Sequence, residues 1–359
     1  MITFWVPAFD AFEPKEYLEG RGQPLADRIT VRTYQWDHED LVVSAGPQIF
    51  AGLDRLTEPE RHGVVDLQRQ LASVAPGTLM LNDPARSLRR RALLETLAAR
   101  RINQFRIYPA DQIGSIQRFP VFVRGESDHE GSLTGLLHSR GEVNRAVRAL
   151  RFRGRRLSEL LIVEFCDTSD GRGLFRKYAA FRVGDAIVPA HVLRGPHWVL
   201  KSEGSDRTMD GVKEDLAFVE QNPHEQWLRE IFTLAGIEYG RMDYGILGAV
   251  PQVWEINLNP TLTRRPGKSP LALDPAVAEI RDRARSLAHR KLREAFTALD
   301  TAEPSRSHTL HVTAEIRAAV ASATRQRRRR HAMVELLRRS YESPFGAPLR
   351  ALLPHNPRP

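Results

Sequence analysis

RMDYGILGAVPQVWEINLNPTLT, residues 241–263, is the stretch that decides the fold of this chain. Two apolar runs, YGIL and PQVWEI, flank a glycine-containing turn, and this pattern predicts a β-hairpin. If the hairpin is centred on Ala249, Asp243 and Glu255 lie directly opposite each other, with Cβ atoms about 5 Å apart. Strand alternation places Asn257 on the same face as Glu255. The stretch therefore predicts two carboxylates and one amide oxygen close together.

Such a group of oxygens has two interpretations. Opposed carboxylates repel each other unless a cation lies between them, and hard oxygen ligands suit Mg²⁺ held jointly with substrate phosphates. Asn259 and Pro260 end the second strand, because proline cannot donate to a sheet ladder. The alternative is an edge hairpin whose acidic side chains face water, and the hairpin alone does not decide between the two.

Length and composition set limits on the class of protein. A chain of 359 residues exceeds the usual size of one domain, so we expect two or three domains. The single cysteine, Cys166, excludes an internal disulfide and a cysteine-based zinc site. No apolar run approaches the roughly 20 residues of a membrane span, and the first residues lack the pattern of a signal peptide. These features predict a cytoplasmic protein.

The positive charge is unevenly distributed. The whole chain carries a net charge of +9, but residues 301–359 hold 11 Arg and no Lys against 4 Glu, a net charge of +7. Only +2 remains for the first 300 residues. The body of the protein therefore does not have the charge expected for binding an extended polyanion.

The first part of the chain alternates strands with helices. Short buried strands are expected at 2–6, 41–45 and 78–81. A helix is expected over Thr57–Val74, with Thr57 as N-cap and Glu60 three residues later. A second helix follows the turn at 82–84. This alternation predicts a small α/β domain over residues 1–105.

The remainder divides into a central and a C-terminal part. In the central part, 106–265, strands are expected at 119–124, 133–137 and 160–167 and at 174–193 around a Gly184-Asp185 turn, with helices at 141–151, 211–221 and near 224–235. The C-terminal part, 266–359, is expected to hold helices at 275–299 and 312–341, a linker at 301–311, and the arginine-rich run RQRRRR at 325–330.

The order of these motifs resembles the ATP-grasp superfamily of Mg·ATP-dependent ligases. The most specific part is Arg241-x-Asp243 with Glu255-x-Asn257-x-Asn259-Pro260, which looks like the superfamily's metal-binding signature. FPVFVR before a glycine-containing loop, the strand LLIVEF, and LNDP before a basic helix occur in the matching order. The resemblance implies an α/β (α+β) fold in which two α+β subdomains, 106–160 and 161–265, sandwich ATP. A small α/β domain would precede them and a helical basic tail would follow.

The resemblance also implies roles for individual residues. Asp243, Glu255 and Asn257 would be the metal ligands. Arg241 would stabilise charge at the reacting carbonyl and phosphoryl groups, and Lys201 would contact the terminal phosphate. One of Arg89–Arg91, with the spacing favouring Arg90, and Arg124 would contact the other phosphates, with arginine at 124 where the family usually has lysine.

Nucleotide contacts are also expected on the strand that ends near Glu164. The segment Glu164-Phe165-Cys166 would supply two backbone hydrogen bonds and an apolar bed for adenine. Asp167 or Asp170 would bind the ribose, and the residues do not distinguish between them. Lys177 lies where many members have an acid, which puts the ribose contacts in question and suggests a phosphate or substrate role. His129, His191 and Trp198 are weaker candidates near the phosphates and the acceptor substrate.

The implied reaction is an ADP-forming ligation of a carboxylate to an amine or thiol through an acylphosphate, with ATP and Mg²⁺ as cofactors. It requires cations and a site closed to water rather than a protein nucleophile. Two alternatives remain: an ATP-grasp kinase acting on a small molecule, and a nucleotide-binding scaffold without turnover. The expected partners are small-molecule or peptide carboxylate and amine substrates. The arginine-rich helix could also bind nucleic acid or an acidic partner.

Overall fold

A computed structural model of the chain describes residues 1–34, 36, 38–127, 131–201, 208–262, 273–300 and 306–342. The chain forms two compact units. Unit 1 contains Met1–Leu88 and Thr168–Val320, and unit 2 contains Arg89–Asp167 and the segment from Ala321 onward. The three-domain division expected above stays a prediction. His129 and Thr263 lie outside the described residues.

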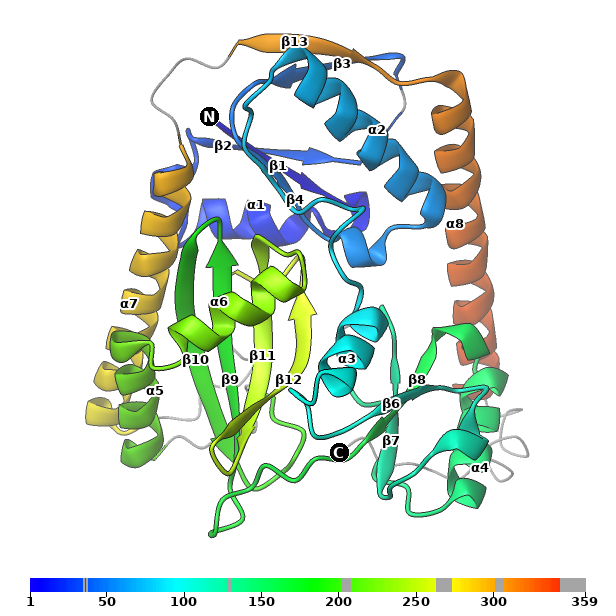
Figure 1. Cartoon of the computed structure of the whole chain (residues 1–359), viewed down its shortest axis with the longest axis vertical. Helices are drawn as coiled ribbons and strands as arrows, with labels where there is room; N and C mark the ends of the chain where they lie inside the picture. Colours follow the sequence, from blue (N-terminus) through cyan, green and yellow to red (C-terminus); the bar gives the residue numbers. More distant parts are fainter. Residues whose placement is uncertain are drawn as a thin grey trace. The chain divides into compact units, whose positions relative to one another are not determined.

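Unit 1 begins with a parallel four-stranded sheet in the order β2-β1-β4-β5 (Figure 1). Its strands are β1 (Ile2–Val6), β2 (Ile29–Thr33), β4 (Gln48–Phe50) and β5 (Met80–Leu81). The helices of this part are α1 (Phe12–Glu19) and α2 (Glu58–Val74). The N-cap and capping box predicted for α2 are confirmed: the Thr57 backbone N–H donates to the Glu60 carboxylate, and the Thr57 side chain accepts from the helix. Strands β2 and β4 are additional to the prediction.

The strand expected at 41–45 is not the buried strand that the sequence predicts. It is β3 (Asp40–Ser44), which pairs antiparallel with β13 (Ser307–His311) in a separate two-stranded sheet. Val42 is 52% exposed, whereas Val43 is fully buried, because only one face of this ribbon is covered. The linker expected at 301–311 therefore contains a strand. A reciprocal pair of hydrogen bonds between His311 and the side chain of Gln70 ties this strand to α2.

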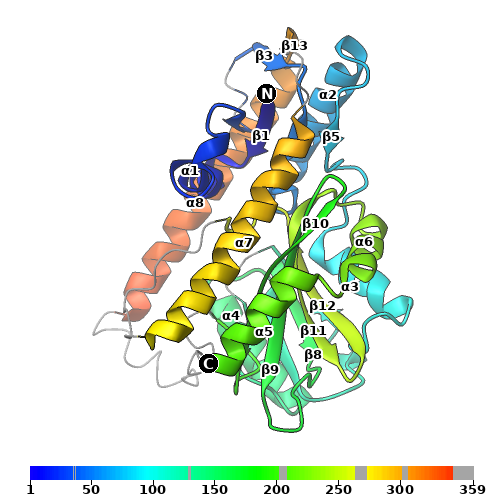
Figure 2. The same ribbon diagram turned by 90° about the vertical axis from the view of Figure 1, so that its left-hand side faces the viewer.

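An antiparallel sheet in the order β10-β9-β11-β12 forms the rest of unit 1. Its strands are β9 (Phe175–Val183), β10 (Ala186–Gly195), β11 (Tyr239–Leu247) and β12 (Val250–Asn257), and the helices are α5 (Met209–Gln221), α6 (Glu225–Leu234) and α7 (Pro275–Leu299). Helices α5 and α7 lie side by side (Figure 2). Tyr178 of β9 packs against Phe218 of α5 with ring centroids 5.3 Å apart, so this face of the sheet is covered by an apolar helix surface.

The β11–β12 hairpin reaches the expected pairing by a different route. Leu247 pairs with Val250, so the turn has two residues rather than three, and Gly248 adopts the left-handed φ of +61° that such a turn requires. A bulge between Asp243 and Tyr244 then shifts the register by one residue, because Trp254 has no partner of its own on β11. Asp243 consequently lies opposite Glu255, as predicted.

Unit 2 is built on the antiparallel sheet β6-β8-β7. Its elements are α3 (Arg90–Ala99), β6 (Ile107–Pro109), β7 (Val121–Gly125), α4 (Arg140–Phe152) and β8 (Leu160–Glu164). Its core contains Val121 and Val123 of β7, Val143 of α4 and Ile162 of β8. The strand expected at 133–137 is not formed: only isolated bridges, Val121 to Leu137 and Arg124 to Ser132, join this loop to β7.

The last helix, α8 (Ala314–Glu342), contains the arginine-rich run. Within the described part of the chain, no helix is long and apolar enough to cross a membrane.

Candidate functional site

Five of the predicted site residues share one face of the sheet β10-β9-β11-β12. Asp243 pairs with Glu255 on β12, and Arg241 pairs with Asn257. On the other side of β11, Asp243 pairs with Ala179 of β9, and Lys177 lies two residues along that strand. Because residues two apart on a strand point to the same face, all five side chains project together. We call this group the acid cluster: Lys177, Arg241, Asp243, Glu255 and Asn257.

Asp243 is at the centre of the acid cluster, and two cations bind it. Its Oδ1 accepts a hydrogen bond from Arg241 Nε at 2.9 Å. Its Oδ2 lies 3.4 Å from Lys177 Nζ and 3.5 Å from Arg241 Nη2. The Asp243 side chain is 4% exposed. A carboxylate buried to this degree needs such partners, since desolvation of an isolated charge is costly.

The electrostatics of the pair follow from this geometry. Burial alone raises the pKa of Asp243, but the charges of Arg241 and Lys177 outweigh burial and hold that pKa below its usual value. Burial alone lowers the pKa of Arg241, but the charge and hydrogen bond of Asp243 outweigh it and raise that pKa. Both groups are therefore ionised at neutral pH.

The oxygen atoms of the acid cluster suit a hard cation. Asp243 and Glu255 offer carboxylates, and Asn257 offers an amide whose Oδ1 also accepts from Asn259 N at 3.0 Å. Among the described residues, no three His, Cys, Asp or Glu side chains come together as a metal site. The predicted ligand set, Asp243, Glu255 and Asn257, has only two acids and stays a prediction. An all-oxygen set of this kind fits Mg²⁺ better than zinc or copper.

Two further residues of unit 1 belong to the surroundings of the acid cluster. His191 of β10 pairs with Ala179, so it lies in the same row as Asp243 and Glu255, and its charge lowers the pKa of Asp243. Glu13 of α1 accepts a hydrogen bond from Thr261 Oγ1 at 3.2 Å, and its charge raises the pKa of Arg241. Glu13 is not among the predicted site residues, because nothing local in the sequence of α1 indicates that it lies near β11.

Lys201, the predicted contact of the terminal phosphate, is exposed and follows β10 by six residues. Within the described parts of the chain, no ion pair or hydrogen bond joins it to the acid cluster. Its proposed role therefore stays a prediction from the resemblance.

In unit 2, the two predicted arginines are both buried. Arg90 Nη1 donates to the backbone oxygens of Gly125 at 3.0 Å and Glu126 at 2.8 Å, so it holds the end of β7 and the loop that follows. A phosphate contact would have to come from another atom of this guanidinium. Arg124 shares a face of β7 with Phe122, opposite the face that packs on α4.

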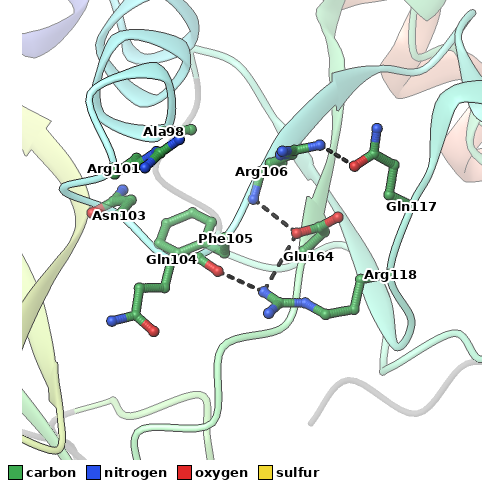
Figure 3. A pocket seen from close by; sticks show the side chains of 9 residues that line it. All are labelled: Ala98, Arg101, Asn103, Gln104, Phe105, Arg106, Gln117, Arg118 and Glu164. Atoms are coloured by element: carbon green, nitrogen blue, oxygen red, sulfur yellow. Dashed lines mark hydrogen bonds and ion pairs between the residues drawn. The ribbon is translucent and has the colours of Figure 1, made fainter.

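Glu164 ends β8 and borders a cavity of about 380 Å³ in unit 2 (Figure 3). Its Oε1 accepts from Tyr108 Oη at 2.8 Å, and its Oε2 accepts from Arg106 N at 3.0 Å and lies 3.4 Å from Arg118. Figure 3 shows the carboxylate between Arg106 and Arg118. This side chain therefore joins three segments of the unit.

Two backbone N–H groups of the segment expected to bind adenine already donate hydrogen bonds within the protein. Glu164 N donates to Arg106 O at 3.0 Å, and Phe165 N donates to Pro120 O at 2.9 Å. Any adenine contact from this segment would have to use its other backbone groups. Burial raises the pKa of the Cys166 thiol to about 11, so Cys166 is not a thiolate nucleophile at neutral pH.

The two candidates for the ribose contact, Asp167 and Asp170, differ in the structure. Asp170 accepts from the backbone N–H groups of Arg172 and Leu174 and pairs with Arg176 at 2.7 Å. Its carboxylate is thus used within the loop before β9. Asp167, the last residue of the first segment of unit 2, is exposed.

Comparison with known proteins gave similar solved structures but no matching family model or curated protein. The similar solved structures include D-alanine–D-alanine ligase from Bacillus anthracis complexed with ATP, with 11% identity, a TM-score of 0.41, and coverage of 83% of this chain and 98% of that chain. A RimK domain ATP-grasp protein from Sphaerobacter thermophilus has 14% identity, a TM-score of 0.43, and coverage of 82% and 98%.

A third similar structure is a RiPP-associated ATP-grasp ligase from Chryseobacterium gregarium in complex with ADP and a leader and core peptide. It has 11% identity, a TM-score of 0.40, and coverage of 87% of this chain and 99% of that chain.

Proposed function

We propose that this chain is an Mg·ATP-dependent ligase of the ATP-grasp type, which joins a carboxylate to an amine or thiol and releases ADP and phosphate. The observation that carries the proposal is the acid cluster: two opposed strand pairs, Asp243 with Glu255 and Arg241 with Asn257, project onto one face of a sheet. The carboxylates of Asp243 and Glu255 are the kind of group that binds Mg²⁺, and the nearby cations Arg241 and Lys177 are the kind that binds phosphate.

In this reaction the γ-phosphoryl group passes from ATP to the substrate carboxylate, giving ADP and an acylphosphate. The amine or thiol then attacks the acyl carbon, the C–O bond to the phosphate breaks, and phosphate leaves together with the proton that the nucleophile loses. Neither step requires a protein nucleophile. The protein's task is to bind, orient and stabilise charge.

The residues divide this task. Asp243, Glu255 and Asn257 would hold Mg²⁺, which neutralises phosphate charge when bound. Arg241 is fixed by its hydrogen bond to Asp243 and would bind negative charge that develops on the substrate. Lys201 would contact the terminal phosphate. Glu13 is a carboxylate near Arg241 and would bind the cationic part of an amine substrate.

The first test is nucleotide binding. We expect a non-hydrolysable ATP analogue to bind in the presence of Mg²⁺, as measured by isothermal titration calorimetry. Glu255→Ala should weaken this binding at least tenfold, because one of two carboxylate ligands is lost. Glu279→Ala, which removes an exposed carboxylate from α7, is the matched control and should leave affinity unchanged.

The second test is the product. ADP and phosphate should form only when a carboxylate substrate is added, and an amine or thiol should be consumed with them. AMP as the sole nucleotide product would contradict the proposal. A stable phosphorylated product without a requirement for an amine would instead identify a kinase. Analogue binding that is equal in wild type and Glu255→Ala would remove the acid cluster from the nucleotide site.

A further inference from the structure

The inference concerns Lys177 and rests on the proposed function of the acid cluster. Both oxygens of Asp243 already face cations of the protein: Oδ1 is bound by Arg241 Nε at 2.9 Å, and Oδ2 lies between Lys177 Nζ at 3.4 Å and Arg241 Nη2 at 3.5 Å. A divalent cation that uses Asp243 as a ligand must therefore approach an oxygen next to a protein cation. Like charges at this separation repel strongly, especially where water is excluded.

The two cations differ in their freedom to move. The Arg241 side chain is 16% exposed, binds both oxygens of Asp243, and also approaches Thr261 O at 3.5 Å. Its planar guanidinium is held in one orientation by these contacts. The Lys177 side chain is 27% exposed and has one ion pair, at 3.4 Å, on a flexible four-carbon stem. Lys177 is therefore the cation that can leave Asp243.

We propose that Lys177 is a resident counter-ion of the acid cluster, which keeps a divalent cation from binding there until nucleotide phosphates draw the ammonium group away from Asp243. When Lys177 leaves Asp243, the phosphates replace Asp243 as the negatively charged partner of its ammonium group. Metal and nucleotide then bind together, and the metal alone binds weakly. Lys177 is a positioning residue in this scheme, since it acts through Asp243 and the phosphates.

The opposing hypothesis is that the Lys177–Asp243 ion pair is purely structural. In that case removal of the ammonium would change stability but not the order in which the ligands bind. The two hypotheses differ in their prediction for metal binding without nucleotide, which is a measurement independent of catalytic turnover.

The experiment is a titration of the intact chain with Mn²⁺ alone, followed by electron paramagnetic resonance. Wild type is compared with Lys177→Met, which keeps a flexible unbranched side chain, one heavy atom shorter, and removes its charge. Lys213→Met, an exposed lysine of α5, is the matched control. We expect Lys177→Met to bind Mn²⁺ at least tenfold more tightly than wild type and the control to equal wild type. Lys177→Arg, which keeps the charge, should also equal wild type.

The complementary measurement is the affinity for the ATP analogue with Mg²⁺ present. Lys177→Met should bind it at least tenfold more weakly, because the phosphates lose a cation. Equal Mn²⁺ affinities in wild type and Lys177→Met would overturn the inference while leaving the proposed function intact. Absence of both Mn²⁺ and analogue binding in every variant, with circular dichroism showing folded protein, would overturn the proposed function as well. Lys177→Gln replaces Lys177→Met if that variant does not fold.

Discussion

Two clusters of opposite charges in unit 1 are arranged in opposite ways. In the acid cluster, one buried carboxylate, Asp243, is bound by two cations. In the second cluster, which we call the loop cluster (Asp170, Arg176, Arg194 and Glu214), one arginine, Arg176, is bound by two partly exposed carboxylates, and Arg194 pairs with Glu214 at 3.5 Å.

The two clusters also differ in which groups donate hydrogen bonds to their aspartates. Asp170 of the loop cluster is held by two backbone N–H groups of its own loop, so its position is determined locally. Among the described residues, Asp243 has no backbone donor and depends on side chains from β9 and β11. The loop cluster therefore shapes a turn, whereas the acid cluster concentrates charge that a ligand can rearrange.

The largest expected effect is on the free energy of unfolding, which should fall more for a substitution in the acid cluster than for one in the loop cluster. Asp243→Asn should lower the free energy of unfolding by about 3 kcal/mol, because it removes the charge of a buried carboxylate and leaves the half-buried guanidinium of Arg241 without its partner. Urea denaturation monitored by fluorescence measures this loss. Asp170→Asn is the matched substitution in the loop cluster and should cost clearly less, since that carboxylate is in contact with water. Equal losses would mean that the two clusters are energetically alike.

A smaller effect is expected from the centre of the loop cluster. Arg176→Gln should lower the free energy of unfolding by about 1 kcal/mol, because its ion pairs are solvent-screened and its carboxylate partners regain water when it is removed. The same denaturation experiment measures it. A loss as large as that of Asp243→Asn would show that the loop cluster is a structural centre of unit 1 rather than a local brace.

The smallest expected effect is a change in the pKa of Asp170, which a pH titration measures. Hydrogen bonds from Arg176 and from the amides of Leu174 and Arg172 lower the pKa of Asp170 to about 2. Because the folded pKa lies below the unfolded value, this contribution to stability is complete above about pH 4 and is lost as pH falls toward 2. Carboxyl ¹³C NMR should give this midpoint in wild type and a higher one in Arg176→Gln. An unchanged midpoint would assign the shift to the backbone amides alone.

Local patterns predicted several elements well. The capping box at Thr57 and Glu60, the two-residue turn at Gly184-Asp185, and the bounds of α7 all depend on hydrogen bonds and periodicity within a few residues. The prediction of a buried strand at 41–45 was wrong about its burial, and the segment predicted as a linker at 301–311 contains a strand. Both errors have one cause: β3 pairs with β13, more than 250 residues away, and no local pattern records that pairing.

In the candidate site, too, some features depend on local sequence patterns and others on long-range packing. The sequence by itself determined that two carboxylates and an amide lie on neighbouring strands, since the alternation of β11 and β12 and the glycine turn are local. The tertiary structure alone decided how they are paired and neutralised. The two-residue turn would have put Asp243 out of register with Glu255, and the bulge at Trp254 restores it. Likewise, Lys177 and Glu13 approach the acid cluster because separate elements fold around β11, and such contacts depend on the packing of the whole unit.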